Sequence, residues 1–132
     1  MIRTRFVAVL TALGCLVLSA CAANAFDDIV GEEPVLPVEV QQLSADLHTL
    51  RPLGEHGDIT YVAAKSRDAG CLVMYRTADP ARPIAACSDG DYVTAGGEDV
   101  GEATFFFKGR KNPGDEFPGE QVSKWLVINR NG

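Results

Sequence analysis

Apolar side chains recur at helical spacing in one stretch of the chain, between residues 36 and 50. Successive members lie four, three, four and three residues apart, which places them on one face of an α-helix. These members are Leu36, Val40, Leu43, Leu47 and Leu50. The run ends at Arg51-Pro52, because the residue before a proline is pushed out of the helical region. The pattern predicts one amphipathic helix whose apolar face rests on a sheet.

Short runs rich in β-branched and aromatic residues predict strands over the rest of the chain. Segments rich in Gly, Pro, Asp and Ser separate these runs, and such residues favour turns. The runs span residues 59–65, 71–76, 82–87, 92–95, 104–108 and 124–129. We therefore expect one α+β domain over residues 38–132, in which one N-terminal amphipathic helix packs on a small antiparallel β-sheet of four to six strands.

Turn chemistry sets the expected register of two hairpins. A turn centred on Asp79 places Cys71 opposite Cys87, at a distance that a disulfide can span. The preceding hairpin is expected to place Val62 opposite Met74. One hairpin disulfide, between Cys71 and Cys87, is therefore predicted. The face predicted to lie under the helix carries Val62, Met74 and Ile84.

The N-terminus has the pattern of a processing signal rather than of a folded element. Arg3 and Arg5 precede an apolar run over residues 6–20, which is shorter than the ~20 residues that a membrane-spanning helix needs. The run ends in Leu18-Ser19-Ala20-Cys21. This sequence resembles the lipobox of bacterial lipoproteins, in which an aliphatic residue, a small residue and Gly or Ala precede a cysteine.

The resemblance implies a membrane anchor at Cys21. In that family a signal peptidase cuts immediately before the cysteine, and the thiol carries a diacylglycerol. Residues 1–20 are then a signal peptide, and residues 21–37 are the lipidated cysteine with a flexible tether rich in acidic residues, Pro and Gly. The alternative is cleavage after Ala25, at the pattern Ala23-Asn24-Ala25, which would release a secreted domain.

Cysteine usage and charge bear on this expected location. Cleavage removes Cys15 and lipid uses Cys21, so Cys71 and Cys87 remain as an even pair for an oxidising compartment. The full chain has 12 basic and 18 acidic residues, and removal of residues 1–20 leaves 10 basic residues against the same 18. This balance argues against nucleic acid as a partner. Because anionic headgroups repel an acidic surface, the expected contact with the membrane is the lipid on Cys21.

Two groups of polar residues are candidates for chemistry. His56-Gly57-Asp58 brings a carboxylate near an imidazole, which is the arrangement of a general base. After the expected processing the chain has no G-x-S-x-G motif and no free cysteine, so we predict no catalytic residues. The second group is acidic and consists of Asp89, Asp91, Glu98, Asp99 and Glu102.

These residues lack the spacing of a calcium loop, so we expect no metal and no other cofactor. The alternative is that they bind calcium.

An acidic loop with one aromatic residue is the candidate for binding a partner. Phe117 follows Asp115 and Glu116 and precedes a Pro-Gly pair, as expected for an exposed anchor. The alternative is that Phe117 folds back over the sheet as a plug. By contrast, Phe105-Phe106-Phe107 and the run that begins at Trp125 are expected in the core, because consecutive apolar strand residues require burial on both faces.

These patterns predict a class of function and no particular ligand. We expect a lipid-anchored protein of the bacterial cell envelope that acts as a binding or interaction module, with another envelope protein as its candidate partner. The alternative is a small envelope hydrolase, or an accessory subunit of an envelope complex, in which His56 and Asp58 act as acid and base. Residues 38–132 resemble no named family.

Overall fold

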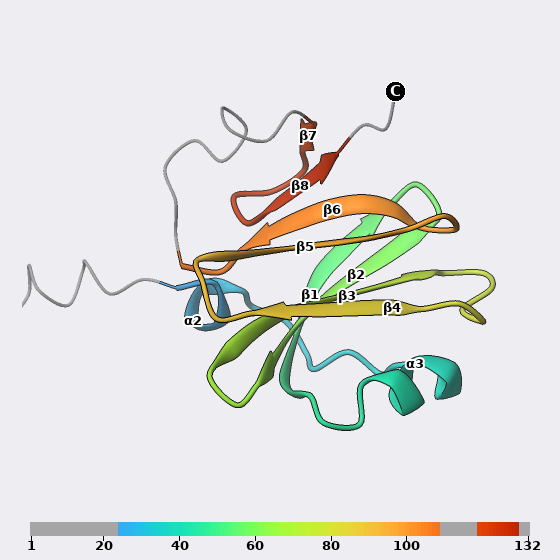
Figure 1. Cartoon of the computed structure of the whole chain (residues 1–132), viewed down its shortest axis with the longest axis horizontal. Helices are drawn as coiled ribbons and strands as arrows, with labels where there is room; N and C mark the ends of the chain where they lie inside the picture. The colour runs from blue at the N-terminus through green and yellow to red at the C-terminus, as the bar shows by residue number, and fades with distance from the viewer. Residues whose placement is uncertain (1–23, 109–118, 130–132) are drawn as a thin grey trace, which may run out of the picture.

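The chain folds into two antiparallel β-sheets that face each other (Figure 1). The computed structural model describes residues 24–108 and 119–129, and the elements below belong to those ranges. The first sheet has the strand order β1-β2-β3-β4, formed by His48–His56, Ile59–Ser66, Ala69–Arg76 and Ile84–Ser88. The second sheet has the order β5-β6-β8-β7, formed by Tyr92–Gly97, Gly101–Phe106, Leu126–Asn129 and Glu120–Gln121. Two short helices, α2 (Ala25–Asp28) and α3 (Val38–Leu43), precede the strands.

The predicted amphipathic helix over residues 36–50 is wrong, and so is the α+β fold class. Only Val38–Leu43 is helical, with a single buried residue, Val40. The helix ends at Ser44, whose hydroxyl donates to the carbonyl oxygen of Val40 at 2.6 Å. From His48 onward the chain pairs with β2 as a strand. The described residues are therefore mostly β-sheet, with no amphipathic helix packed on it.

The helical spacing misleads because the apolar residues are divided between two elements: Val40 and Leu43 lie in α3, whereas Leu50 lies in strand β1. A helix of six residues is weak by itself, and the side chain of Pro37 provides no cap for it. Thr49 lies in the left-handed region with a φ of 54°, and Pro52 follows, so a continuous helix is excluded. From His48 onward, pairing with β2 gives the backbone amides and carbonyls hydrogen-bond partners. Leu47 and Leu50 still pack on apolar residues of the first sheet.

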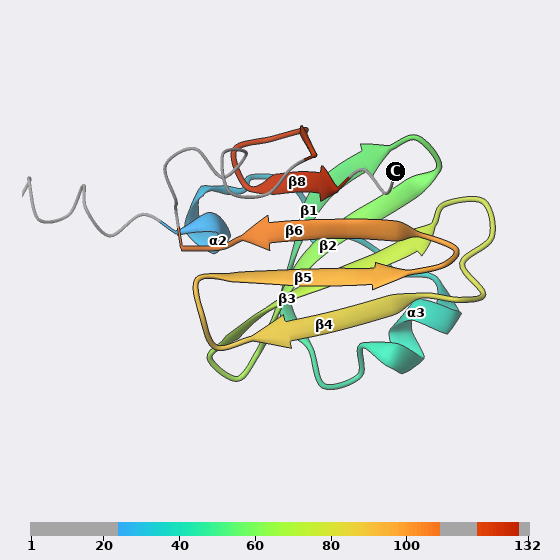
Figure 2. The ribbon, with the colours of Figure 1, turned by 45° about the horizontal axis from the view of Figure 1, so that its top comes forward.

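The main core lies between the two sheets. The first sheet contributes Tyr61, Ala63, Leu72 and Met74, and the second contributes Val93, Ala103, Phe105 and Leu126. Strand β4 runs beside β5, so the sheets adjoin along one side, as Figure 2 shows. The predicted burial of Phe105-Phe106-Phe107 and Trp125 is confirmed, since none of these residues is more than 7% exposed. A second sheet, rather than a helix, therefore covers the inner face of the first.

One predicted hairpin register is confirmed, and the other is wrong by one residue. Between β3 and β4, Cys71 faces Cys87 as expected. Between β2 and β3, Val62 faces Val73, and this slip turns each β2 side chain to the other face. The turn explains the error, because Arg67 adopts a φ of 56° in a tight turn where glycine is the usual residue. Val62 thus joins a second cluster, on the outer face of the first sheet, with Leu36, Val40, Val73 and Tyr75.

The segment predicted to be a flexible tether contributes to the core at its beginning. Ala25 and Phe26, both in α2, are 0% and 5% exposed. The side-chain oxygen of Asn24 caps this helix by accepting from the backbone amides of Phe26 and Asp27. The acidic and proline-rich pattern led to the tether prediction, whereas Phe26 attaches the beginning of the segment to the core.

Candidate functional site

The turns between strands gather at two opposite ends of the molecule (Figure 2). One end contains the turns after β1, β3 and β5, at residues 57–58, 77–83 and 98–100, and we call it the hollow end. The other contains α2 together with the turns after β2 and β4, at residues 67–68 and 89–91, and we call it the α2 end. Because consecutive strands are antiparallel, alternate turns must lie at opposite ends.

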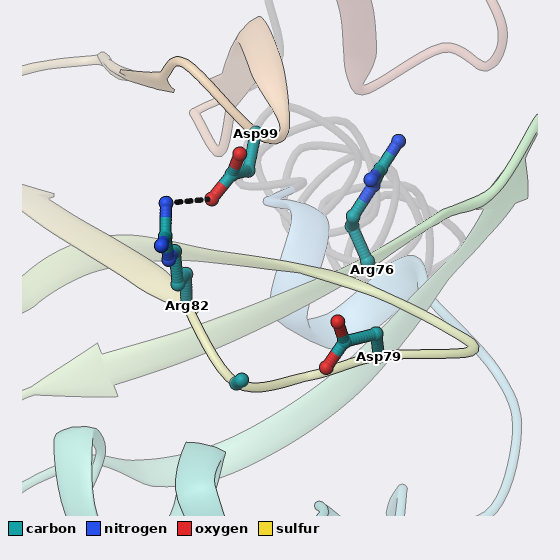
Figure 3. A pocket seen from close by; sticks show the side chains of 5 residues that line it. Arg76, Asp79, Arg82 and Asp99 are labelled. Carbon is teal, nitrogen blue, oxygen red and sulfur yellow. Dashed lines mark hydrogen bonds and ion pairs between the residues drawn. The ribbon is translucent and has the colours of Figure 1, made fainter.

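A polar hollow of about 280 Å³ opens at the hollow end. It is lined by Arg76, Asp79, Ala81, Arg82 and Asp99, from the end of β3, the loop after it and the turn after β5. Figure 3 shows Arg82 reaching across to Asp99, with Nη1 and Oδ2 3.3 Å apart. The Arg76 guanidinium pairs with Asp58, outside the lining, with Nη2 and Oδ2 3.0 Å apart.

The ion pairs of the hollow are accessible and easily exchanged. The side chain of Arg82 is 80% exposed and that of Asp99 is 37% exposed. Exposed pairs of this kind contribute only about 0–1 kcal/mol, so a ligand can replace them at little cost. Within the described residues, the Asp79 carboxylate makes no ion pair. The hollow therefore offers guanidinium groups to an anionic group and a carboxylate to a cationic one.

The two residues of the alternative acid–base pair, His56 and Asp58, contact different side chains. His56 and Asp58 flank Gly57, whose φ of 63° makes the turn between β1 and β2. His56 Nε2 lies 3.1 Å from an oxygen of Glu120 on β7, while Asp58 pairs with Arg76. Both side chains are largely exposed, at 43% and 64%. The turn therefore contacts neighbouring elements through His56 with Glu120 and through the ion pair of Asp58 with Arg76, and His56 does not bond to Asp58.

The predicted acidic group is dispersed over the structure. Asp91 lies 3.9 Å from the Lys108 ammonium at the α2 end, whereas Asp99 pairs with Arg82 at the hollow end. Glu102 accepts a hydrogen bond from the side-chain amide of Asn129 on β8. Among residues 24–108 and 119–129, no three or more His, Cys, Asp or Glu side chains gather in a way that suits a metal ion.

Lysines from distant parts of the sequence meet around α2. Lys65 lies over the Phe26 ring, with its ammonium 4.9 Å from the ring centroid. The Lys124 ammonium lies 3.4 Å from an oxygen of Asp28 and 4.7 Å from the centroid of the Trp125 ring. Lys108 directly follows Phe107, whose carbonyl oxygen accepts from the first amide of α2. Sequence analysis missed this group, because its members lie 16 to 59 residues apart.

The predicted disulfide is confirmed, and its two cysteines differ in exposure. Cys71 on β3 and Cys87 on β4 are bonded, with their Cα atoms 4.0 Å apart. Cys71 is fully buried, whereas Cys87 lies exposed on an outer strand of the first sheet. Cys71 is near the start of β3 and Cys87 is near the end of β4, so the bond joins the two strands at the α2 end, opposite the loop of the hollow.

Several predicted site residues lie outside the described residues. These are the proposed lipid attachment point, Cys21, and the proposed partner-binding residues Asp115, Glu116 and Phe117. Their roles stay predictions. In the described part of the chain, no helix has the length and apolar character needed to cross a bilayer.

Comparisons with known proteins give no relative. Neither a protein-family model, nor a curated protein, nor a solved structure matches the chain. The fold and the hollow define its class by themselves: a small, disulfide-linked β-sandwich with a polar, charged opening at one end.

Proposed function

We propose that this chain is an exported lipoprotein of the bacterial envelope, which is anchored through lipid on Cys21 and binds a polar partner at its hollow end. The observation that carries the proposal is the bond between Cys71 and Cys87. Such a bond fits an oxidising compartment outside the cytoplasm. It also leaves Cys21 as the one remaining thiol after cleavage at the lipobox-like sequence Leu18-Ser19-Ala20-Cys21.

The lining of the hollow favours recognition of a partner that carries both charges. Arg76 and Arg82 are suited to a carboxylate, because guanidinium groups bind carboxylates through paired N–H donors. Asp79 is suited to an amine in the same hollow. A polar segment of another envelope protein supplies both groups. Its binding would replace two exposed ion pairs rather than break buried ones.

Mass spectrometry of the processed chain tests the anchor. The full chain is produced in a bacterial host, and its N-terminal peptide is isolated. We expect a peptide that begins at Cys21 and carries a diacylglycerol on the sulfur. The matched control is Cys21→Ser, which should remain uncut and without lipid. A wild-type product that begins at Phe26 without an acyl group would overturn the anchor and leave a secreted domain.

Crosslinking from two positions tests the binding site. A photoreactive amino acid replaces Ala81 in the hollow, or Asp89 at the α2 end as the matched control. In envelopes of the source cells, we expect a defined protein adduct from position 81, which weakens several-fold when Arg82→Ala or Asp79→Ala is added. Equal adducts from both positions, or adducts that neither substitution changes, would overturn the assignment of the hollow.

A further inference from the structure

We infer that the α2 end is the face on which this protein rests on a lipid bilayer, so that the hollow faces away from the membrane. The inference rests on the proposed lipid anchor at Cys21 and adds an orientation to it. Two observations carry it: the short link between Cys21 and the fold, and the attachment of α2 to the core.

The link between the lipid and the folded domain is too short to let the domain turn freely. Asn24, which caps α2, is only three residues after Cys21. At ~3.3–3.6 Å per residue, this link spans about 10 Å when fully extended. A domain of about 100 residues has a radius of gyration of about 13 Å, so it measures roughly 30 Å across. The α2 end must therefore stay near the headgroups, while the opposite end lies beyond their reach.

Helix α2 cannot easily lengthen this link by leaving the core. The amide of Ala25 donates to the Phe107 carbonyl oxygen at 2.9 Å. The Phe26 ring packs edge-on against Phe105, with the ring centroids 5.7 Å apart. The Lys124 ammonium holds the other end of the helix through Asp28. Detachment would expose Phe26 to water and break all three contacts.

The α2 end holds cationic and acidic side chains together, because Asp27, Asp28, Asp68, Asp89 and Asp91 lie there beside four cations. Lys65, Lys108 and Lys124 lie there, together with Arg67 in the turn after β2. Each lysine has an aliphatic stem that can lie along apolar surface while its ammonium reaches lipid phosphate. The carboxylates offset these cations, so charge alone does not draw this end to the membrane. A lipid surface is the occupant because the lipid on Cys21 and the short link hold this end beside it.

Short-range fluorescence quenching tests the orientation. Trp125 is the single tryptophan, so Trp125→Phe gives a silent background into which one reporter is placed. Asp68→Trp puts an exposed reporter at the α2 end, and Ala81→Trp puts one at the hollow. Each mature lipoprotein is reconstituted into phosphatidylcholine vesicles that contain a lipid with a nitroxide on its headgroup. We expect the tryptophan at position 68 to lose at least about threefold more of its emission than that at position 81, since the two ends are roughly 30 Å apart.

The control changes only the length of the link. A Gly/Ser segment of about 20 residues, inserted between Ala23 and Asn24, gives a flexible reach of about 25 Å. We expect this insertion to abolish most of the difference between the two reporters. A difference that persists would show that surface attraction, not the short link, sets the orientation, and would overturn this account.

The remaining outcomes separate the orientation from the anchor. Mass spectrometry first establishes that each reconstituted sample carries lipid on Cys21. Equal quenching at positions 68 and 81, or stronger quenching at 81, would overturn the orientation while the anchor stands. Weak quenching at both positions would also overturn the orientation, because neither end would then rest on the headgroups. Failure of the wild-type chain to acquire lipid would overturn the proposed function itself.

Discussion

At the scale of single residues, two tyrosines make stability depend on alkaline pH. Burial raises the pKa of Tyr61 above its ordinary value of 10.0, and the charge of Asp58 raises it further. Burial also raises the pKa of Tyr75; the hydrogen bond with Thr60 lowers it, and the charge of Glu55 raises it. The folded state therefore retains protons that the unfolded state loses near pH 10.

The sign of the effect follows from that difference in proton binding. The contribution of these phenols to stability is complete below pH 10 and is lost as the pH rises through the folded-state pKa values. We expect the denaturant midpoint to fall as the pH rises from about 9 to 11.5. In the Tyr61→Phe variant the fall should be shallower. Curves of equal slope for wild type and variant would mean that lysines, rather than Tyr61, cause the loss.

Gly70 lies so close to the Phe107 ring that a side chain at this position would clash with it. A Cβ at this position would lie 2.4 Å from the Phe107 ring. Gly70→Ala should therefore lower the free energy of unfolding by about 1–3 kcal/mol, as is typical of overpacking. Adding Phe107→Leu should recover part of the loss, because the smaller side chain vacates that space. The control is Gly90→Ala, whose Cβ would meet only the Ser88 hydroxyl at 3.4 Å, and a similar loss there would contradict the steric explanation.

At the scale of elements, the disulfide between β3 and β4 should carry a large share of the stability. Its cysteines are 16 residues apart. Closure of a loop of this size restricts the unfolded chain by about 3 kcal/mol in the chain-entropy model. We expect the double variant Cys71→Ala/Cys87→Ala to unfold at a markedly lower denaturant concentration than the oxidised protein. Reductant should shift the wild-type curve in the same direction and leave that of the double variant unchanged; an unaffected wild-type curve would refute the prediction.

Helix α2 should behave as part of the fold despite its four residues. Phe26→Ala removes a ring that is 5% exposed and should cost about 3–5 kcal/mol, as for other buried aromatic residues. Val30→Ala, four residues later, alters a side chain that is 87% exposed and should change stability by less than about 0.5 kcal/mol. Chemical denaturation of both variants measures the contrast. Equal, small effects would show that the N-terminal segment is a tether after all.

The same elements show which parts of the fold could be predicted from the sequence and which could not. The hairpin of β3 and β4 was predictable, because Asp79-Pro80 is a distinct turn signal that fixes the Cys71–Cys87 register. The neighbouring turn was not, since Arg67 takes a left-handed conformation that its residue type does not announce. The helix over residues 36–50 failed for a third reason: leucines at helical spacing also suit a short helix followed by an irregular strand, and only pairing with β2 decides between them.

At the scale of the whole molecule, the candidate site depends on how distant segments meet. Arg82 and Asp99 come together only because the turns after β3 and β5 lie at the same end. No local pattern contains that information, so sequence analysis proposed Phe117 with Asp115 and Glu116 for binding and kept His56 with Asp58 as the catalytic alternative, and both groups are close in sequence. The grouping of the lysines around α2 likewise cannot be recognised from the sequence alone. What the sequence does predict, the even pair of cysteines and the buried aromatic run, depends on local composition and alternation.

The net charge of the molecule leads to a prediction about salt. The described residues include many carboxylates without an ion pair, such as Glu32, Glu33 and Glu39, whereas the ion pairs are few and exposed. Repulsion among the carboxylates should therefore exceed the attraction within the pairs. Raising NaCl from about 10 to 200 mM should screen the repulsion and increase the melting temperature by about 2–4 °C.

A charge-neutralised variant separates screening from other effects of salt. Glu32→Gln/Glu33→Gln removes two exposed charges from a segment where no ion pair is present among the described residues. Its melting temperature at low salt should exceed that of the wild type, and its response to NaCl should be smaller, because less repulsion remains to be screened. If the melting temperature of the wild type instead falls as NaCl is added, the ion pairs at the two ends contribute more than the repulsion. The contacts of His56, Asp58 and Asp99 would then be structural supports, and a ligand could not exchange them as cheaply as the proposed binding at the hollow requires.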